Sequence, residues 1–214
     1  MLRETAARIK DRGVGVYDVE VVWLKPDFDA KTLARFFEVC AALGAKAILV
    51  GGTDPDVARM TQSFAALCAA AKPYGLTADL EFMPWTAVPD VRTAHQIVGD
   101  AGRSNGGMLV DALHFARSSS TLADIRAVPA SWLHYAQICD APALAPETTD
   151  GLVHAARRER LLQGDGGLAL RELFGVLPVH VPVSIELPND RRIAKIGSRE
   201  WARLALSATR QVLE

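Results

Sequence analysis

The sequence predicts an α/β protein built on a parallel sheet, and three features support this prediction. Short apolar segments typical of buried strands alternate with segments typical of helices along the 214 residues. Four successive strand candidates end in an oxygen-bearing side chain. Half of the residues are hydrophobic, so the chain is able to bury the core of one domain, residues 1–214.

The first half of the chain shows this alternation with clear end signals. Gly13, Gly44 and Gly75 each follow a helical pattern, at the position where a left-handed residue ends a helix. Asp29 precedes another helical pattern and is a candidate N-cap. The expected helices span residues 2–12, 29–43, 54–74 and 88–99, and the expected strands span residues 14–24, 46–50, 76–82 and 106–110, with Gly51 and Gly52 after the second strand.

The second half continues the pattern with one long interruption. Residues 141–166 are rich in Pro, Thr and Gly and are expected to form a loop. Ser198 is the expected cap of the terminal helix. The expected elements are a short helix at 122–127, a strand at 132–139, a helix at 168–177, a strand at 181–187 and a helix at 199–213.

The strand ends favour a closed barrel over an open doubly wound sheet. An open sheet usually binds its ligand at one switch point, whereas four consecutive strands here end in candidate ligands. A complete eight-stranded barrel typically has ~250 residues. Because the sequence contains six strand-then-helix units and begins with a helix, we expect a TIM-barrel-type (β/α) repeat of about six parallel strands, lacking the first two βα units.

The polar strand ends stand in recognisable strings. These are Leu-Glu81-Phe-Met-Pro-Trp, Asp111-Ala-Leu-His114, His-Tyr-Ala-Gln137-Ile-Cys-Asp and Ser-Ile-Glu186-Leu-Pro. The segment from Arg157 to Gly166 is basic and rich in glycine. From about Gly13 to the C-terminus this pattern resembles the xylose-isomerase-like TIM barrels, and more narrowly their sugar phosphate isomerase/epimerase group.

The resemblance implies a divalent metal ion and a small substrate. The metal, commonly Mn, Mg, Co or Zn in this family, would be held by Glu81, Asp111, Gln137 and Glu186. The substrate would be a polyol or keto-sugar that chelates the metal. The family more often has histidine where this chain has Gln137, although glutamine is the ligand in some members, including 3-dehydroshikimate dehydratases. An amide oxygen favours Mn or Mg over Zn.

The residues support a metal for a physical reason as well. Carboxylates gathered at one barrel mouth repel each other unless a cation neutralises them. The alternative is that Glu81, Asp111 and Glu186 are rim residues paired with arginines, of which the candidates are Arg92, Arg103, Arg117 and Arg191.

The chemistry expected at such a site is proton transfer next to a carbonyl. Glu81 and Glu186 are the candidate acid/base pair, although Glu186 is otherwise most simply a ligand alone. His114 is placed to hydrogen-bond a substrate oxygen or act as an acid, or only to cap a helix. Asp140 either orients a ligand or is an ordinary strand-end acid.

Further substrate contacts are expected from loops that follow the strands. Arg157 and Arg160 could clamp a carboxylate or phosphate, or form a solvated basic face of a helix. Arg117, beside three serines, offers a similar choice. Trp85 would line the pocket or simply cover the core. His134 and His180 precede strands, at the end opposite to the expected site, and are expected to be structural.

Composition excludes several classes of protein. The net charge of −1 gives no basic footprint for nucleic acid, and five histidines are too few for the trinuclear zinc endonucleases of the family. No apolar run is long enough for a membrane span, and the N-terminus is too charged for a secretory signal. The three widely spaced cysteines indicate free thiols in a reducing cytoplasm.

These observations leave three hypotheses. The first is a cytoplasmic metal-dependent isomerase or epimerase of a sugar, sugar phosphate or related polyol. The second uses the same site to eliminate water, as in inosose or 3-dehydroshikimate dehydratases. The third is a shortened barrel without turnover that acts as a binding or assembly partner. In the third case a partner chain or homo-oligomer would cover the open side of the barrel.

Overall fold

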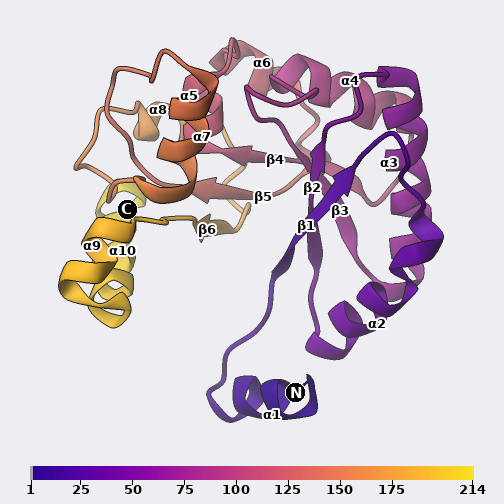
Figure 1. Cartoon of the computed structure of the whole chain (residues 1–214), viewed down its shortest axis with the longest axis horizontal. Helices are drawn as coiled ribbons and strands as arrows, with labels where there is room; N and C mark the ends of the chain where they lie inside the picture. The colour runs from indigo at the N-terminus through magenta and orange to yellow at the C-terminus, as the bar shows by residue number, and fades with distance from the viewer. Residues whose placement is uncertain (1) are drawn as a thin grey trace. The chain divides into compact units, whose positions relative to one another are not determined.

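The computed structural model describes residues 2–214, and its six strands form one sheet in sequence order, β1-β2-β3-β4-β5-β6 (Figure 1). The pairs β1–β2, β2–β3 and β5–β6 are parallel. The strands are β1 Asp18–Leu24, β2 Ala47–Gly52, β3 Thr77–Glu81, β4 Gly106–Asp111, β5 Leu133–Ile138 and β6 Val183–Ile185. Helices separate the strands along the chain, which confirms the predicted six-stranded (β/α) repeat.

The chain divides into two compact units. The first runs from the N-terminus to Glu81 and includes Thr86–Val88 and Thr93–Met108. The second comprises Phe82–Trp85, Pro89–Arg92 and Leu109–Glu214. Strand β3 therefore belongs to the first unit, and β5 and β6 belong to the second.

In the first unit the signals at Asp29, Gly44 and Gly75 are confirmed, whereas the helix predicted over residues 88–99 spans Val91–Ala101. The Asp29 side chain accepts a hydrogen bond from the backbone N–H of Lys31, and Gly44 and Gly75 adopt left-handed φ angles of 72° and 71°. The helical segments are α1 Leu2–Asp11, η1 Ala30–Leu33, α2 Ala34–Leu43, α3 Val57–Ala71, η2 Lys72–Tyr74 and α4 Val91–Ala101, the last of which has its first two residues in the second unit.

Two details of the first unit differ from the expectation. Helix α3 begins at Val57 rather than at residue 54, because the Asp56 side chain caps it by accepting from the N–H of Arg59. The two glycines lie inside β2 and not after it. A Cβ on Gly52 would overlap Met60 and Val88, so the absence of a side chain allows close packing against this strand.

The second unit contains three helices that the sequence did not predict. Its helical segments are α5 Ala112–Arg117, α6 Leu122–Ala127, η3 Ala130–Trp132, α7 Thr149–Arg158, α8 Leu170–Phe174, α9 Asp190–Ile196 and α10 Ser198–Leu213. Of these, α6 has the predicted bounds, whereas α5, α7 and α9 are new. The prediction of an unbroken loop over residues 141–166 was wrong, because Thr148 caps α7 through the N–H of Gly151.

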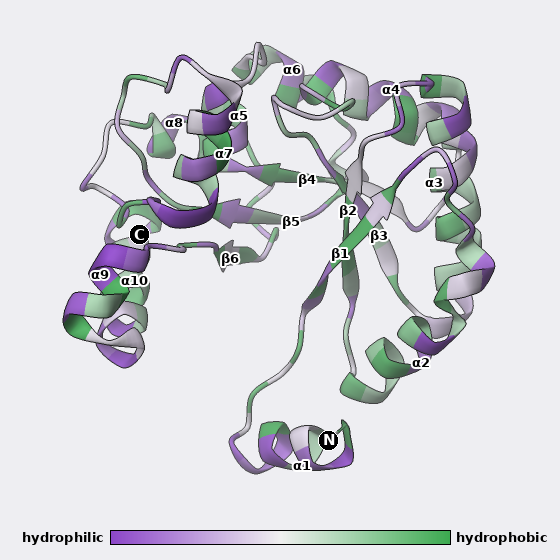
Figure 2. Ribbon diagram, viewed as in Figure 1, coloured by the Kyte–Doolittle hydropathy of each residue, from purple (hydrophilic) through white to green (hydrophobic). Residues whose placement is uncertain are grey.

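The terminal helix α10 packs one side on the core of the second unit. Trp201 and Ala205 are buried there with Leu187 and Cys139, and the indole N–H of Trp201 donates to the carbonyl of Leu187 at 2.9 Å. Figure 2 shows the alternation of hydrophobic and hydrophilic residues along α10 that such packing requires. Ser198 is not the cap that was predicted, since it is the first helical residue and Gly197 takes the N-cap position.

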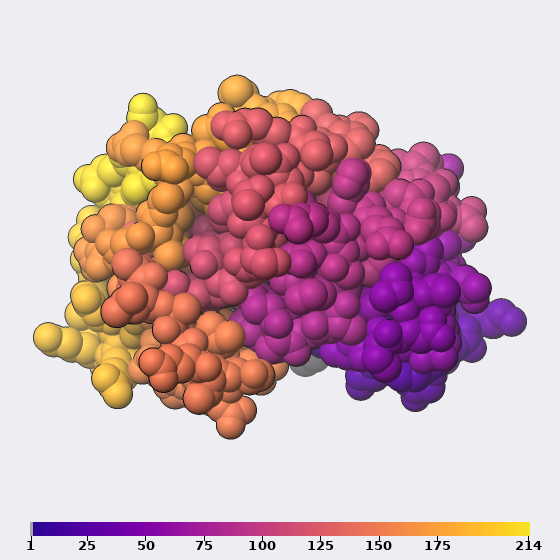
Figure 3. Space-filling model, turned by 90° about the horizontal axis from the view of Figure 1, so that it is seen from above, coloured from indigo at the N-terminus to yellow at the C-terminus, as the bar shows by residue number. Residues whose placement is uncertain are grey.

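The surface of the second unit includes the segment that leads into α7. Residues 142–145 and 147–150 are exposed, and the salmon-orange spheres near position 150 lie on the face shown in Figure 3.

No helix in the described residues is both long enough and apolar enough to cross a membrane.

Candidate functional site

Asp111 has two local roles because it is both the last residue of β4 and the N-cap of α5. Its side chain is fully buried, and Oδ1 accepts a hydrogen bond from the backbone N–H of His114 at 2.9 Å. A carboxylate at an N-cap satisfies backbone donors that the helix leaves unpaired. The turn between β4 and α5 therefore holds the Asp111 carboxylate at the C-terminal end of the strand.

Arg160 connects two of the predicted metal ligands. Its Nη1 donates to Asp111 Oδ2 at 2.6 Å, and its Nη2 lies 3.1 Å from Glu186 Oε2. The arginine side chain is only 1% exposed, so the predicted alternative of a solvated basic face does not hold for Arg160. Its Nη1 also lies 3.4 Å from Cys139 Sγ, a buried thiol whose pKa is raised to about 12 by burial.

The electrostatics of this group leave an excess negative charge. Burial by itself would raise the pKa of Asp111, but Arg160 and His114 outweigh it and hold this pKa below the ordinary value. Burial lowers the pKa of Arg160 and the nearby acids raise it, Asp111 most strongly, with a net rise well above the ordinary value. Two carboxylates thus share one guanidinium, which neutralises only one of them.

Gln137 and Glu186 lie at the same end of neighbouring strands. In the parallel register of β5 and β6, Gln137 is opposite Ser184, and the backbone N–H of Glu186 donates to the Ile138 carbonyl at 3.2 Å. Gln137 is fully buried, whereas the Glu186 side chain is 29% exposed. This side of the site is therefore open to solvent at Glu186.

His114 lies in the first turn of α5 and is buried against Trp85. The two rings meet edge to face, with centroids 5.0 Å apart and an interplanar angle of 81°. Burial lowers the pKa of His114 to about 4, with Asp111 opposing this effect, so the imidazole is neutral at pH 7. A neutral imidazole suits a hydrogen-bonding role better than that of a cationic acid. Trp85 also packs against the core cluster of the second unit.

Asp140 organises the glycine-rich segment that follows Arg160. Its carboxylate accepts hydrogen bonds from four backbone N–H groups, those of Ala141, Gly164, Gly166 and Leu168, at 2.8 to 3.1 Å. A Cβ on Gly166 would overlap Asp140 and the Ala141 carbonyl, so this position requires glycine. Asp140 accordingly positions a loop. Neither sequence interpretation, an acid that orients a ligand or an ordinary strand-end acid, included this role.

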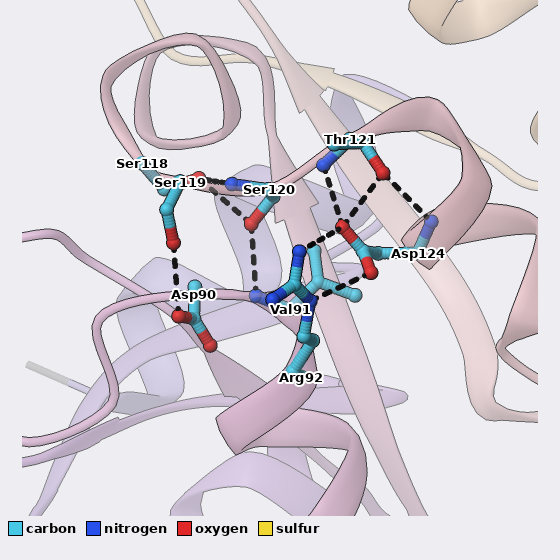
Figure 4. A network of polar contacts seen from close by, with 8 residues as sticks. All are labelled: Asp90, Val91, Arg92, Ser118, Ser119, Ser120, Thr121 and Asp124. Carbon is cyan, nitrogen blue, oxygen red and sulfur yellow. Dashed lines mark hydrogen bonds and ion pairs between the residues drawn. The ribbon is translucent and has the colours of Figure 1, made fainter.

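The remaining predicted contacts are dispersed. Arg117 donates to the carbonyls of Pro142 and Ala143, at 2.5 and 3.3 Å, and so ties down the chain after β5. Arg157 is exposed in the last turn of α7. Figure 4 shows Arg92 paired with Asp124, at 2.8 Å. This candidate rim arginine therefore pairs with an acid that is not one of the predicted metal ligands.

Glu81 belongs to the first unit and is its boundary residue. It is 4% exposed, ends β3, and is followed directly by Phe82–Trp85 of the second unit. In the β2–β3 register it lies opposite Gly51. Glu81, Asp111 and His114 are buried side chains that each offer a metal-ligating atom.

The donor chemistry of these residues fits a hard divalent cation. Within the second unit, Asp111 and Glu186 provide carboxylate oxygens and Gln137 an amide oxygen, at the ends of β4, β5 and β6. Oxygen donors of this kind suit Mg and Mn. The excess negative charge next to Arg160 supports the same conclusion.

Comparison with protein families identifies the chain. A model described as xylose isomerase-like TIM barrel matches residues 3–212. The chain therefore belongs to the xylose isomerase-like TIM barrel family, as the strand-end strings predicted. Comparison with curated proteins finds no match.

Solved structures of similar fold include isomerase-like proteins. An IolI protein with a bound zinc atom has a TM-score of 0.84 and 20% identity, over 99% of this chain and 81% of that one. A D-allulose 3-epimerase from Methylomonas sp. has a TM-score of 0.73 and 15% identity, over 99% and 82%. A xylose isomerase-like TIM barrel/4-hydroxyphenylpyruvate dioxygenase fusion protein has a TM-score of 0.78 and 20% identity, over 95% and 36%. At these identities the likeness is one of fold.

Proposed function

We propose that this chain is a divalent-metal-dependent isomerase or epimerase of a sugar, sugar phosphate or related polyol. The observation that carries the proposal is the set of oxygen donors at successive strand ends, in a chain of the xylose isomerase-like family. Similar folds in an epimerase and in a zinc-containing IolI protein support it.

The proposed ligands are Glu81, Asp111, Gln137 and Glu186. The first three are buried and the fourth is partly exposed, so substrate would reach the site past Glu186. Glu81 is included because it is the C-terminal residue of β3 and carries a buried carboxylate. Mn or Mg is the expected ion because all four donors are oxygens, and Co or Zn is the alternative.

The chemistry divides between the ion and the side chains. When bound, a divalent ion supplies Lewis-acid polarisation of a substrate carbonyl. The Glu186 carboxylate, being partly exposed, is the proposed base that removes a proton from the neighbouring carbon, and Glu81 is the proposed acid that returns one. Neutral His114 would hydrogen-bond a substrate oxygen, and Trp85 would hold its ring in place.

The substrate contacts beyond the metal ligands are part of the same proposal. Arg160 is the basic residue closest to the acids and is the proposed partner of a substrate carboxylate or phosphate. Arg117 and Arg157 are weaker candidates for substrate binding. Arg117 already donates to two backbone carbonyls, and Arg157 is exposed on α7. The proposed setting is a reducing cytoplasm, which agrees with three buried free cysteines.

A second candidate function is elimination of water at the same site. Gln137, an amide in place of the family's more usual histidine, favours this alternative, which would act on a 3-dehydroshikimate or inosose type of substrate. Product analysis separates the two reactions, because isomerisation conserves the mass of the substrate and dehydration lowers it by one water.

Metal content of the purified protein tests the proposal. After loading with Mn²⁺ and removal of free ion, we expect about one ion per chain in the wild type and loss of the ion in Asp111→Asn and Glu186→Gln. Asp190→Asn is the control, because Asp190 is an exposed acid paired with Arg158. Absence of metal in the wild type would contradict both enzyme proposals. The hypothesis of a binding or assembly protein would then remain, and a size measurement on the same sample would detect its homo-oligomer or its complex with a partner.

A further inference from the structure

The guanidinium of Arg160 already uses the oxygens that a metal ion would need. Nη1 donates to Asp111 Oδ2 at 2.6 Å and Nη2 lies 3.1 Å from Glu186 Oε2. The other Asp111 oxygen accepts from the N–H of His114. Both oxygens of Asp111 and one oxygen of Glu186 are therefore engaged without an ion.

The rest of Arg160 is anchored to neighbouring backbone. Its Nε donates to the Ala156 carbonyl at 2.8 Å, its backbone N–H donates to the Pro188 carbonyl at 3.1 Å, and its own carbonyl accepts from Asn189 Nδ2 at 2.9 Å. The two backbone contacts hold the base of the residue, and the Nε contact holds one edge of the guanidinium. Because Nε, Nη1 and Nη2 form one rigid planar group, the contact that can change while the anchor remains is the one with the partly exposed Glu186 side chain.

The two acids differ in how easily the guanidinium can leave them. The Asp111 side chain is 0% exposed and its contact with Arg160 is a short hydrogen bond. The Glu186 side chain is 29% exposed and its contact is longer. The Oε2 atom of Glu186 is itself buried, but its contact with Nη2 is the longer of the two and is therefore expected to exchange first.

A divalent ion bound to the same oxygens would lie close to a positive guanidinium. Like charges a few ångströms apart repel strongly when they are partly shielded from water. Removing the guanidinium would therefore favour the ion. The carboxylates of Asp111 and Glu186 supply the attraction that brings the ion in.

We propose that Arg160 is a resident counter-cation that competes with the divalent ion for Asp111 and Glu186, and that ion binding separates Glu186 from Nη2. The inference rests on the proposed function, since it concerns the same site. It goes beyond that function by giving the chain a metal-free state in which its own arginine stabilises the ligands.

Binding of Mn²⁺ to EDTA-treated protein tests this inference without any assay of activity. Free Mn²⁺ is measured by electron paramagnetic resonance during titration of the wild type, Arg160→Gln and Arg160→Lys. We expect Arg160→Gln to bind Mn²⁺ about tenfold more tightly or better, because a competing charge has been removed. Arg160→Lys should lie between the two, since one ammonium is too short to contact both acids.

The matched control is Arg158→Gln. Arg158 lies two residues away, is 59% exposed and pairs with Asp190. Its replacement should leave Mn²⁺ affinity at the wild-type value. Circular dichroism establishes that each variant is folded, and if Arg160→Gln is not folded the comparison of Arg160→Lys with the wild type decides the question.

The outcomes separate this inference from the proposed function. Mn²⁺ binding by the wild type that is unchanged or weaker in the Arg160 variants overturns the inference alone, and weaker binding would show that the guanidinium orients the ligands. Absence of Mn²⁺ binding in the wild type and in every Arg160 variant overturns the proposed function and the inference together.

Discussion

The two units of the chain each contain a buried aspartate paired with an arginine, but the charges are arranged differently. In the first unit, Asp54 is 1% exposed and Arg59 contacts both of its oxygens, at 2.5 and 2.7 Å. Arg59 is itself 44% exposed. In the second unit, Arg160 is 1% exposed and is shared between Asp111 and Glu186.

The difference distinguishes a structural ion pair from a candidate binding site. Arg59 reaches Asp54 through two short hydrogen bonds, and the side-chain hydrogen bond from Arg59 lowers the pKa of this carboxyl below its ordinary value. Asp56, which Arg59 also contacts, is half exposed and therefore solvated. The Asp111 side chain, in contrast, is not exposed to water, and it shares the single positive charge of Arg160 with Glu186. A buried group with unbalanced charge has a physical reason to bind a further cation.

The largest expected effect comes from removing the shared arginine. In EDTA, Arg160→Met should lower the free energy of unfolding by about 3–5 kcal/mol, because it leaves the buried Asp111 carboxylate without the guanidinium that offsets its charge. Arg59→Met should have a clearly smaller effect, since Arg59 is half exposed. Urea unfolding followed by circular dichroism measures both. Equal losses in the two variants would remove the distinction between the clusters. Mn²⁺ should stabilise Arg160→Met more than the wild type.

The next largest effect concerns the protonation of His114. Its pKa is about 4 in the folded chain and 6.5 is the ordinary value, so the unfolded chain takes up the proton first as pH falls. The stability contributed by neutral His114 is therefore complete above pH 6.5 and is lost between about pH 6.5 and 4. Between pH 8 and pH 5 we expect this one residue to remove about 2 kcal/mol.

Urea unfolding at a series of pH values checks this expectation. His114→Gln should reduce the pH dependence over that interval, whereas His180→Gln, at an exposed position, should not. The measurement is made without metal, so that it reports the buried cluster itself. A His114→Gln variant with the full wild-type slope would show that the histidine does not contribute to it.

A smaller effect is expected from the loop that follows Arg160. Gly166→Ala would place a methyl group against Asp140 and the Ala141 carbonyl and displace the loop, at a cost of about 2 kcal/mol. Gly15→Ala is the control, because a Cβ there meets nothing within 4 Å. If the loop positions Arg160, Gly166→Ala should also change Mn²⁺ affinity, and an unchanged affinity would separate the loop from the site.

The smallest expected effect lies in a cluster of the second unit whose acids are individually satisfied. Thr121 and Asp124 form a reciprocal capping box at the start of α6, and Arg92 pairs with Asp124 (Figure 4). Thr121→Ala should cost about 1 kcal/mol, the usual effect of losing a cap. Ser198→Ala should cost much less, because Ser198 is no cap. Mn²⁺ affinity should not change in either variant, and a change would mean that the binding site extends to α6.

Local signals accounted for most of the elements. Asp29, Gly44 and Gly75 end or begin helices as predicted, because capping depends on residues adjacent in the sequence. Helix α7 was missed because the Pro- and Thr-rich approach to it, with Gly151 in its first turn, has the composition of a loop. Helix α5 is not predicted because both interpretations of Asp111, a metal ligand and a rim acid, leave out its role as a helix cap.

The sequence by itself determined the repeat of strand and helix, the family and the polar residues at the strand ends. These follow from periodicity and from neighbours along the chain. Only the tertiary structure decided which arginine meets the acids. Arg160 is 49 residues from Asp111, and the exposed Arg157 has the same chemistry only three positions earlier. Burial and charge pairing depend on how distant segments pack, and no local pattern encodes that choice.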